Sequence, residues 1–133
     1  MYTIPMRFLH AGDEMAKNDV EYKPLVSIII PTYNEKNDVR FSLNSAIGFE
    51  YPNKEIIVVD DSTDETPEII KEYEKYGVRL VRRASRANGC CGARNLGILE
   101  AKGEIVVLLN ADVFPPKNFL DRILIHYKDG ADY

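Results

Sequence analysis

The stretch that decides the fold is Val26-Ser-Ile-Ile-Ile-Pro-Thr-Tyr-Asn-Glu35, a β-branched apolar run that ends abruptly in polar residues. Apolar residues at successive positions are typical of a parallel strand that is buried on both faces. Open parallel sheets bind ligands just beyond the carboxyl ends of their strands, so such polar ends are expected to share one crevice. Two later stretches have the same form, Glu55-Ile-Ile-Val-Val-Asp-Asp-Ser62 and Glu104-Ile-Val-Val-Leu-Leu-Asn-Ala-Asp112.

The segments between these strands have helical spacing of their apolar residues. Gly77 lies where a helix C-cap is expected, and Pro115-Pro116 lies where a helix begins. The alternation predicts a three-layer α/β/α fold with a Rossmann-like, mostly parallel sheet. The expected helices span 36–48, 64–76, 93–102 and 117–127; a short strand spans 78–81, a loop spans 82–92, and residues 130–133 begin a further strand.

The length and charge of the chain limit what it can bind. Its 133 residues suffice for one domain over 24–133, preceded by an N-terminal extension over 1–23. The net charge of −4 disfavours nucleic acid as a partner, because binding to the phosphate backbone requires a basic face. An anionic ligand would therefore need a metal, a helix N-terminus or a specific arginine.

The chain carries no sign of export or of a membrane span. No apolar run approaches the roughly 18 residues of a spanning helix, and the first residues do not form a signal peptide. Cys90 and Cys91 are adjacent and are predicted to be reduced thiols. We expect a cytoplasmic protein, with peripheral attachment to the inner face of a membrane left open.

The aspartates that end the second strand suit a nucleoside. Asp60 and Asp61 can accept hydrogen bonds from a base imide or from ribose hydroxyls. Alternatively, Asp61 or Ser62 caps the turn and helix that follow. Phosphoacceptor domains also carry paired aspartates, but on the first strand, so the position on the second strand disfavours that class.

The other two strand ends offer an aromatic ring and a metal ligand. The Tyr33 ring is a candidate base-stacking wall, and the alternative for this segment is turn chemistry with Asn34 as an N-cap. Asp112 is a hard oxygen ligand for Mg²⁺ or Mn²⁺, with phosphate oxygens completing the shell. Its alternative role is to cap the turn into Pro115.

Arginines provide the candidate anion contacts. Arg94 follows a glycine-containing loop near the start of a helix, where it would meet phosphates or ribose, or else pair with an aspartate at the strand ends. A second basic group is interpreted as a solvated surface, namely Arg79, Arg82, Arg83 and Arg86.

Taken together, these segments resemble the nucleotide-sugar half of family 2 glycosyltransferases, which have the GT-A fold with parallel strand order 3-2-1-4. The resemblance covers about residues 24–133. Each motif is weak alone, but the set in this order is specific. The set comprises the three strand-end motifs, the second of them extended as Ile57-Val-Val-Asp-Asp-Ser-Thr-Asp-Glu-Thr66, and Gly92-Ala-Arg-Asn-Leu-Gly97.

The resemblance implies a role for each strand end. Asp61 would contact the base with Asp60 beside it, and Arg94 would lie near the ribose or phosphates. The Asp-X-Asp motif of the family corresponds to Asn110-Ala-Asp112, so Asp112 would bind the metal and Asn110 would touch the ribose or the metal. The nucleoside would be bordered by Pro31, Thr32, Tyr33 and Glu35.

The resemblance also implies a reaction. A sugar would be transferred from a nucleotide diphosphate sugar, with a UDP-sugar as the first candidate, to a saccharide or lipid acceptor, with Mg²⁺ or Mn²⁺. Asn110 departs from the family pattern, and an amide brings no negative charge to the metal. The catalytic base is expected in a later C-terminal segment, so we interpret the sequence as a fragment, an engineered piece or a natural truncation that is inactive alone.

Two other function classes remain open at this point. A non-catalytic nucleotide-sugar-binding module or subunit is favoured by Asn110 and by the missing base. A nucleotidyltransferase shares the broad architecture, but it would carry a glycine- and arginine-rich loop after the first strand, which Pro31-Thr-Tyr-Asn-Glu35 does not resemble.

The predicted strand order leaves one apolar edge exposed. In the order 3-2-1-4 the strand at 104–109 lies at the edge of the sheet, and it is apolar on both faces. Long apolar edges associate with other strands. We therefore predict that this edge is covered by the N-terminal extension or by a second copy of the chain in a homodimer.

Overall fold

The computed structural model describes residues 2–5, 23–128 and 130, with side chains described from residue 23 onward. These residues form a five-stranded sheet in the order β1-β5-β2-β3-β4. The parallel strands, taken in chain order, follow the predicted arrangement 3-2-1-4, so the predicted fold is confirmed. The strands are β1 (Tyr2–Pro5), β2 (Val26–Thr32), β3 (Lys54–Asp60), β4 (Val78–Arg82) and β5 (Ile105–Leu108).

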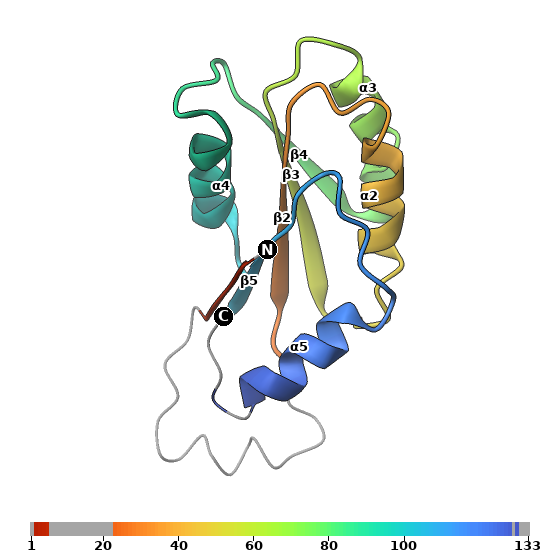
Figure 1. Cartoon of the computed structure of the whole chain (residues 1–133), viewed down its shortest axis with the longest axis vertical. Helices are drawn as coiled ribbons and strands as arrows, with labels where there is room; N and C mark the ends of the chain where they lie inside the picture. Colours follow the sequence, from red (N-terminus) through yellow and green to blue (C-terminus); the bar gives the residue numbers. More distant parts are fainter. Residues whose placement is uncertain (1, 6–22, 129, 131–133) are drawn as a thin grey trace.

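Helices cover both faces of this sheet (Figure 1). On one face lies α4, and on the other lie α2 and α3, with α5 crossing below the sheet in this view. The result is the α/β/α layering that the sequence predicts. The helices are α2 (Val39–Ile47), α3 (Thr66–Lys71), the 3₁₀ turn η2 (Glu74–Tyr76), α4 (Gly89–Glu100) and α5 (Phe119–Lys128).

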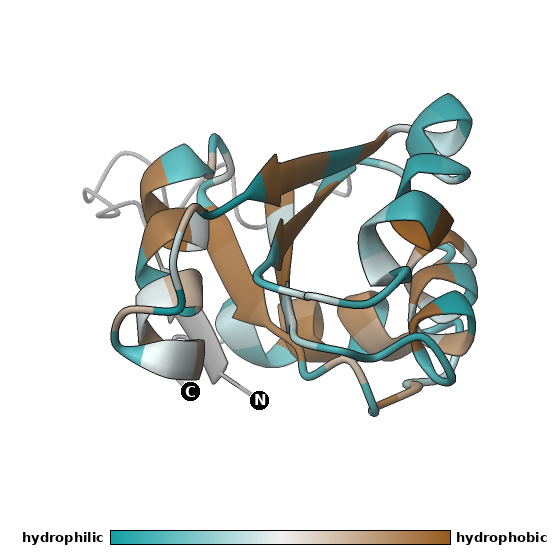
Figure 2. Ribbon diagram, turned by 90° about the horizontal axis from the view of Figure 1, so that it is seen from above, coloured by the Kyte–Doolittle hydropathy of each residue, from teal (hydrophilic) through white to brown (hydrophobic). Residues whose placement is uncertain are grey.

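The central strand β2 is buried at every position, as its uninterrupted apolar run predicts. Its residues alternate between two cores. Ile28 and Ile30 pack with α2, α3 and α5, whereas Ile29 packs with Ala93 of α4. In Figure 2 the strands are coloured mostly as hydrophobic between the two helical layers. Burial on both faces fixes the parallel register of β2, and so aligns its polar end with the end of β3.

One glycine sets how closely α4 approaches the sheet. A Cβ atom at Gly97 would lie 2.3 Å from Cγ2 of Ile29, which is far inside van der Waals contact. The backbone of α4 therefore packs directly on the β2 side chain. This contact explains the second glycine of the Gly92-to-Gly97 motif and places the first turn of α4 beside the carboxyl end of β2.

Most predicted boundaries shift by a few residues, and two helices differ more clearly from the sequence prediction. The helix expected over 64–76 is divided into α3 and η2, although it ends as predicted at Gly77, whose φ of 89° suits glycine. The helix expected from residue 93 begins at Gly89, because Asn88 adopts a left-handed conformation with φ 61° that turns the chain into α4 early. The expected loop over 82–92 is therefore shorter than predicted.

The edge of β5 is covered, as predicted, by residues from the N-terminus. Strand β1 pairs antiparallel with β5, with Thr3 opposite Val107 and Ile4 opposite Val106. Most of the expected extension over 1–23, and the strand expected over 130–133 apart from Gly130, lie outside the described residues. Within the part that is described, no helix has the length and apolar character needed to cross a membrane.

Candidate functional site

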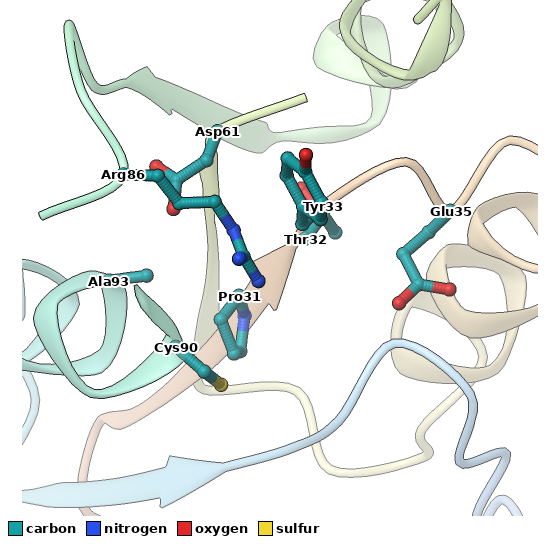
Figure 3. A pocket seen from close by; sticks show the side chains of 8 residues that line it. All are labelled: Pro31, Thr32, Tyr33, Glu35, Asp61, Arg86, Cys90 and Ala93. Atoms are coloured by element: carbon teal, nitrogen blue, oxygen red, sulfur yellow. The ribbon is translucent and has the colours of Figure 1, made fainter. Parts of the chain in front are cut away.

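A cavity of about 220 Å³ lies at the carboxyl ends of β2 and β3, where the sequence places the ligand crevice. The register aligns Thr32 with Asp60, so the two strands end together. Five residues of the predicted site line this cavity, and three further lining residues were not predicted to belong to it (Figure 3). The predicted ones are Pro31, Thr32, Tyr33, Glu35 and Asp61, and the additional ones are Arg86, Cys90 and Ala93.

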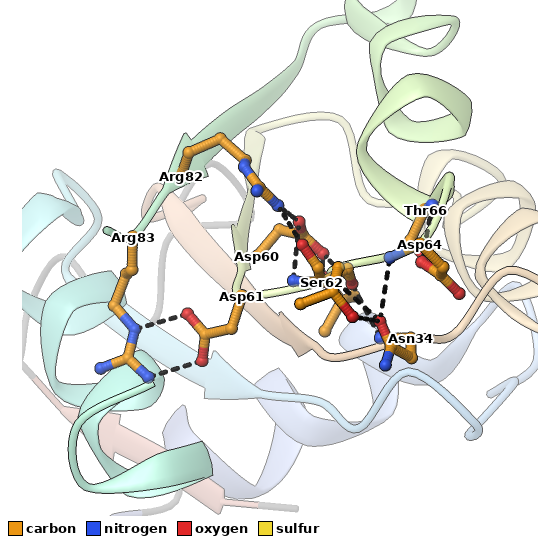
Figure 4. Close-up of polar contacts among 10 residues, drawn as sticks. Asn34, Asp60, Asp61, Ser62, Asp64, Thr66, Arg82 and Arg83 are labelled. Atoms are coloured by element: carbon orange, nitrogen blue, oxygen red, sulfur yellow. Dashed lines mark hydrogen bonds and ion pairs between the residues drawn. The ribbon is translucent and has the colours of Figure 1, made fainter. Parts of the chain in front are cut away.

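Asp60 lies beneath the cavity and does not line it. Its side chain is 0% exposed. One carboxylate oxygen accepts hydrogen bonds from the hydroxyls of Thr32 at 2.5 Å and Ser62 at 2.6 Å. The other accepts from the Ser62 backbone N–H at 3.2 Å and from the Arg82 guanidinium (Figure 4). Asp60 therefore joins the ends of β2, β3 and β4, and it positions the lining residue Thr32.

Asp61 faces the cavity and is held by Arg83. The Arg83 guanidinium donates two parallel hydrogen bonds to the carboxylate, of 2.6 Å from Nε and 2.5 Å from Nη2 (Figure 4). These hydrogen bonds are the main reason that the pKa of Arg83 is raised. The same guanidinium donates to the carbonyls of Ala87 and Gly89, each at 2.9 Å, and so holds the loop before α4.

The interpretation of the arginine group as a solvated surface is wrong for Arg83, whose side chain is only 11% exposed. Arg82 is exposed, at 45% of its side chain, but it also pairs with a fully buried carboxylate. Asp60 and Arg82 are direct cross-strand partners in the parallel register of β3 and β4. The sequence therefore contained a sign of these ion pairs, because an Asp-Asp pair and an Arg-Arg pair end two successive strands.

Asn34 links two loops instead of capping α2. The side-chain oxygen of Asn34 accepts from the backbone N–H groups of Thr63 at 2.9 Å and Asp64 at 3.2 Å. The backbone N–H of Asn34 donates to the Ser62 hydroxyl at 2.7 Å. The N-cap of α2 is Asp38, without a side-chain hydrogen bond, so the capping alternative for Asn34 is wrong. The loops after β2 and β3 are thereby fixed to each other beside the cavity.

The turn into α3 is held by Asp64, and not by Asp61 or Ser62 as the capping alternative proposed. The Asp64 carboxylate accepts from the Thr66 backbone N–H at 2.9 Å and from the Thr66 hydroxyl at 2.5 Å. Asp61 and Ser62 make the contacts described above instead. The capping alternative for those two residues is therefore not found in the described hydrogen bonds.

Arg94 and Asn110 meet each other outside the cavity wall. Arg94 Nη2 donates to the side-chain oxygen of Asn110 at 2.6 Å, which ties α4 to the end of β5. The alternative in which Arg94 pairs with an aspartate at the strand ends is not found in the described contacts, where its partner is the Asn110 amide. The Nε atom of Arg94 is buried without a described partner.

The candidate metal ligand lies in a region of negative charge. Asp112 is exposed. The pKa of Glu35 is raised, first by its partial burial and then by the negative charge of Asp112. Among the described residues no group of three or more metal-binding side chains could hold an ion by itself. Oxygen donors suit Mg²⁺ or Mn²⁺. A cation at Asp112 would also relieve the repulsion at Glu35, so this exposed carboxylate suits a divalent metal that takes its other ligands from outside the described residues.

The first glycine of the Gly92-to-Gly97 motif allows the loop before α4 to pack around Arg83. A Cβ atom at Gly92 would lie 2.3 Å from the Ala87 carbonyl oxygen and 2.4 Å from Nη1 of Arg83. Glycine at this position allows the loop to close around the guanidinium. Cys90 and Cys91 are exposed free thiols, and Cys90 adds its side chain to the cavity wall.

Comparison with known proteins identifies the family of this chain. The family model described as Glycosyl transferase family 2 matches residues 27–133. The putative teichuronic acid biosynthesis glycosyltransferase TuaG of Bacillus subtilis is 36% identical over 105 residues, covering 77% of this chain and 42% of the relative. The chain therefore spans less than half of the length of this relative.

Two solved structures have the same fold as this chain. Mannosyltransferase PcManGT from Pyrobaculum calidifontis, in complex with GDP-Man and Mn²⁺, matches with a TM-score of 0.72 and 33% identity over 78% of this chain and 32% of that chain. S. aureus TarS 1-349 in complex with UDP-GlcNAc matches with a TM-score of 0.73 and 29% identity over 78% of this chain and 31% of that chain. The sheet order, the converging strand ends and these matches agree, and the chain belongs to glycosyltransferase family 2.

Proposed function

We propose that this domain binds a nucleotide diphosphate sugar, with a UDP-sugar as the first candidate, for transfer of the sugar to a saccharide or lipid acceptor. The observation that carries the proposal is the cavity at the ends of β2 and β3, which combines the half-exposed Tyr33 ring with the Asp61 carboxylate. The solved relatives that hold UDP-GlcNAc or GDP-Man support the same ligand class.

The cavity wall suits a nucleoside. The Tyr33 ring is 39% exposed and offers a face for base stacking. Each Asp61 oxygen has two lone-pair directions, and Arg83 occupies one on each, so a base N–H would have to reach the second direction on a side chain that is only 3% exposed. Pro31, Thr32 and Glu35 border this space, with Asp60 fixing Thr32 from below.

The phosphates and ribose would lie toward β5. Asp112 would hold Mg²⁺ or Mn²⁺ together with the diphosphate oxygens, while Asn110 and Arg94 would contact the ribose or phosphates. When bound, the metal neutralises the charge that develops on the leaving diphosphate. Asn110 supplies an oxygen without negative charge, so we expect weaker metal affinity than two carboxylates would give.

A second candidate is a binding module that holds the donor without turnover. Asn110 is the observation that favours it, because the amide weakens the metal site on which departure of the leaving group depends. For either function we propose a cytoplasmic location, where free thiols such as Cys90 and Cys91 stay reduced. Attachment to the inner face of a membrane is the alternative location.

A thermal-shift panel tests the proposal. UDP, GDP, CDP and dTDP are each added with and without Mn²⁺. A ligand at about 100 times its dissociation constant stabilises the folded state by roughly 2.7 kcal/mol, which raises the Tm of a domain of this size by several degrees. A Mn²⁺-dependent rise with one diphosphate supports donor binding and selects the base. No shift with any of the four would contradict it. Release of free sugar or its transfer then separates the enzyme from the binding module.

The variant Asn110→Asp tests the motif at the end of β5. A second carboxylate beside Asp112 should tighten Mn²⁺-dependent binding of the selected diphosphate about tenfold, because hard cations bind more tightly as ligand charge increases. Titration calorimetry measures the change. Asn118→Asp is the matched control, since Asn118 is exposed and does not line the cavity. Equal affinity for Asn110→Asp and the wild type would argue against a metal at this position.

A further inference from the structure

Arg86 differs from the other arginines near the strand ends in having no described acceptor for its hydrogen bonds. The Arg86 guanidinium lies against an aromatic ring, and no described carboxylate or carbonyl accepts from its side chain. Its N–H donors are therefore available for a ligand. The four other arginines between residues 79 and 94 all donate to a side-chain oxygen: Arg79 to Glu100, Arg82 to Asp60, Arg83 to Asp61 and Arg94 to Asn110.

The position of this guanidinium is inside the candidate site. Its central carbon lies 3.7 Å from the centroid of the Tyr33 ring, and both residues line the cavity. In Figure 3 the Arg86 side chain reaches across the cavity toward Pro31 and lies beside Tyr33. A cation–π contact at an exposed site is weak, so it holds the guanidinium in place without preventing its movement.

The backbone beneath Arg86 is fixed, although its side chain is exposed. The Gly89 N–H donates to the Arg86 carbonyl at 2.8 Å, and Arg83 holds the carbonyls of Ala87 and Gly89 at 2.9 Å. The Arg83 guanidinium is in turn held by Asp61. The loop therefore presents Arg86 at a constant place on the cavity rim, and only the side-chain torsions need to change for it to reach a ligand.

The surrounding charge requires such a cation. The chain has a net charge of −4, and Glu35 and Asp112 lie around the region where a diphosphate would bind. Asp61 and Arg83 neutralise each other, and Arg86 is the arginine among the described lining residues. Arg86 is left to offset the repulsion between these carboxylates and an anionic ligand.

We infer that Arg86 binds the diphosphate of the ligand in this cavity. Without a ligand its guanidinium stacks on the Tyr33 ring, and a nucleobase displaces it from the ring. The inference rests on the proposed function. Base and guanidinium compete for the same ring, so stacking of the base releases Arg86, whose planar fork then donates two parallel hydrogen bonds to phosphate oxygens. Recognition of the base and of the diphosphate is thereby coupled through Tyr33.

The test compares a nucleoside with its diphosphate by titration calorimetry in the presence of Mn²⁺. UDP and uridine are the first pair, and GDP and guanosine replace them if the thermal-shift panel selects guanine. Arg86→Gln should weaken binding of the diphosphate tenfold or more, while binding of the nucleoside is unchanged or tightens a few fold, because the competitor for the Tyr33 ring is removed. The diphosphate affinity of Arg86→Lys should lie between those of the wild type and Arg86→Gln, because lysine keeps the positive charge but lacks the planar two-donor geometry of arginine.

Arg79→Gln is the matched control, because Arg79 pairs with Glu100 at the far end of α4 from the cavity. It should leave both affinities unchanged. Unchanged diphosphate binding by Arg86→Gln overturns this inference alone, and so does an equal loss for nucleoside and diphosphate. If the wild type binds no nucleoside diphosphate, the proposed function fails and the inference fails with it.

Discussion

Two adjacent aspartates at the end of β3 have different structural roles. Asp60 is fully buried and accepts from Thr32, Ser62 and Arg82, whereas Asp61 lines the cavity and is paired with Arg83. Alternation along a strand sends successive side chains to opposite faces. One of the pair therefore holds the strand ends together, and the other faces the ligand space.

Asp60→Asn tests the structural role of the buried carboxylate. An amide keeps one acceptor oxygen and brings two N–H groups toward existing donors, so we expect a loss of about 1–3 kcal/mol in the free energy of unfolding. Arg82→Gln should cost less, because the Arg82 head is partly in solvent. Urea unfolding measures both. Asp121→Asn, an exposed change on α5, is the control, and equal stability of Asp60→Asn and this control would contradict the role.

The site residues that could be predicted from the sequence are those that directly follow or end the parallel strands. Pro31, Thr32, Tyr33, Glu35 and Asp61 were predicted because parallel strands bring their carboxyl ends to one edge. The partners of the aspartates were missed because the register between β3 and β4 depends on where each strand starts, and a shift of one residue exchanges the faces. Arg86 was missed because its ring contact joins loops that are distant in sequence.

The first turn of α3 depends on one side chain. Asp64 accepts from both the N–H and the hydroxyl of Thr66. The pKa of Asp64 is lowered: partial burial acts to raise it, but the hydrogen bonds from Thr66 and the charge of Lys36 outweigh that effect. The charged carboxylate therefore stabilises the folded state at any pH well above 3.8, the ordinary pKa of the group.

Asp64→Ala should lower the free energy of unfolding by about 1 kcal/mol at pH 7, as the loss of a helix-start acceptor does. Because the folded-state pKa is depressed, the stabilisation is lost as the pH falls below 3.8 and through the lower folded value. The Tm difference between wild type and variant should therefore shrink between pH 5 and pH 3. A difference that stays constant over this interval would show that the carboxylate charge does not contribute.

Helix positions were predicted better than helix starts. The apolar spacing located α2, α4 and α5, but α4 begins several residues before the predicted start. That start depends on the left-handed Asn88 and on the packing of the loop around Arg83. The packing around Arg83 involves its ion pair with Asp61, which lies in a distant segment, and no local pattern reveals that pair.

The whole sheet depends on how its β5 edge is covered. Strand β1 pairs with β5 along residues 2–5, so the apolar edge predicted from the strand order is covered within one chain. This pairing removes the need for a second copy of the chain at that edge. Strand β1 pairs with β5 alone, so it can be deleted without interrupting the rest of the sheet.

Deletion of residues 1–5 tests this account of the edge. The deletion leaves the backbone groups of β5 on that side without partners, and exposed apolar edges associate. We expect the deleted protein to self-associate at concentrations where the full chain does not, as measured by light scattering after size-exclusion chromatography. A deletion variant with the same mass in solution and the same Tm as the full chain would contradict the pairing.

The central claim is that this domain binds a nucleotide diphosphate with a metal at Asp112. The most direct test is titration calorimetry of the diphosphate selected by the thermal-shift panel, with and without Mn²⁺, on wild type and Asp112→Asn, with Asp121→Asn as the control. We expect Mn²⁺ to tighten binding at least tenfold, about 1.4 kcal/mol, in the wild type and the control. We expect no such gain in Asp112→Asn, with metal-free binding unchanged. The same Mn²⁺ effect in all three proteins would contradict the central claim.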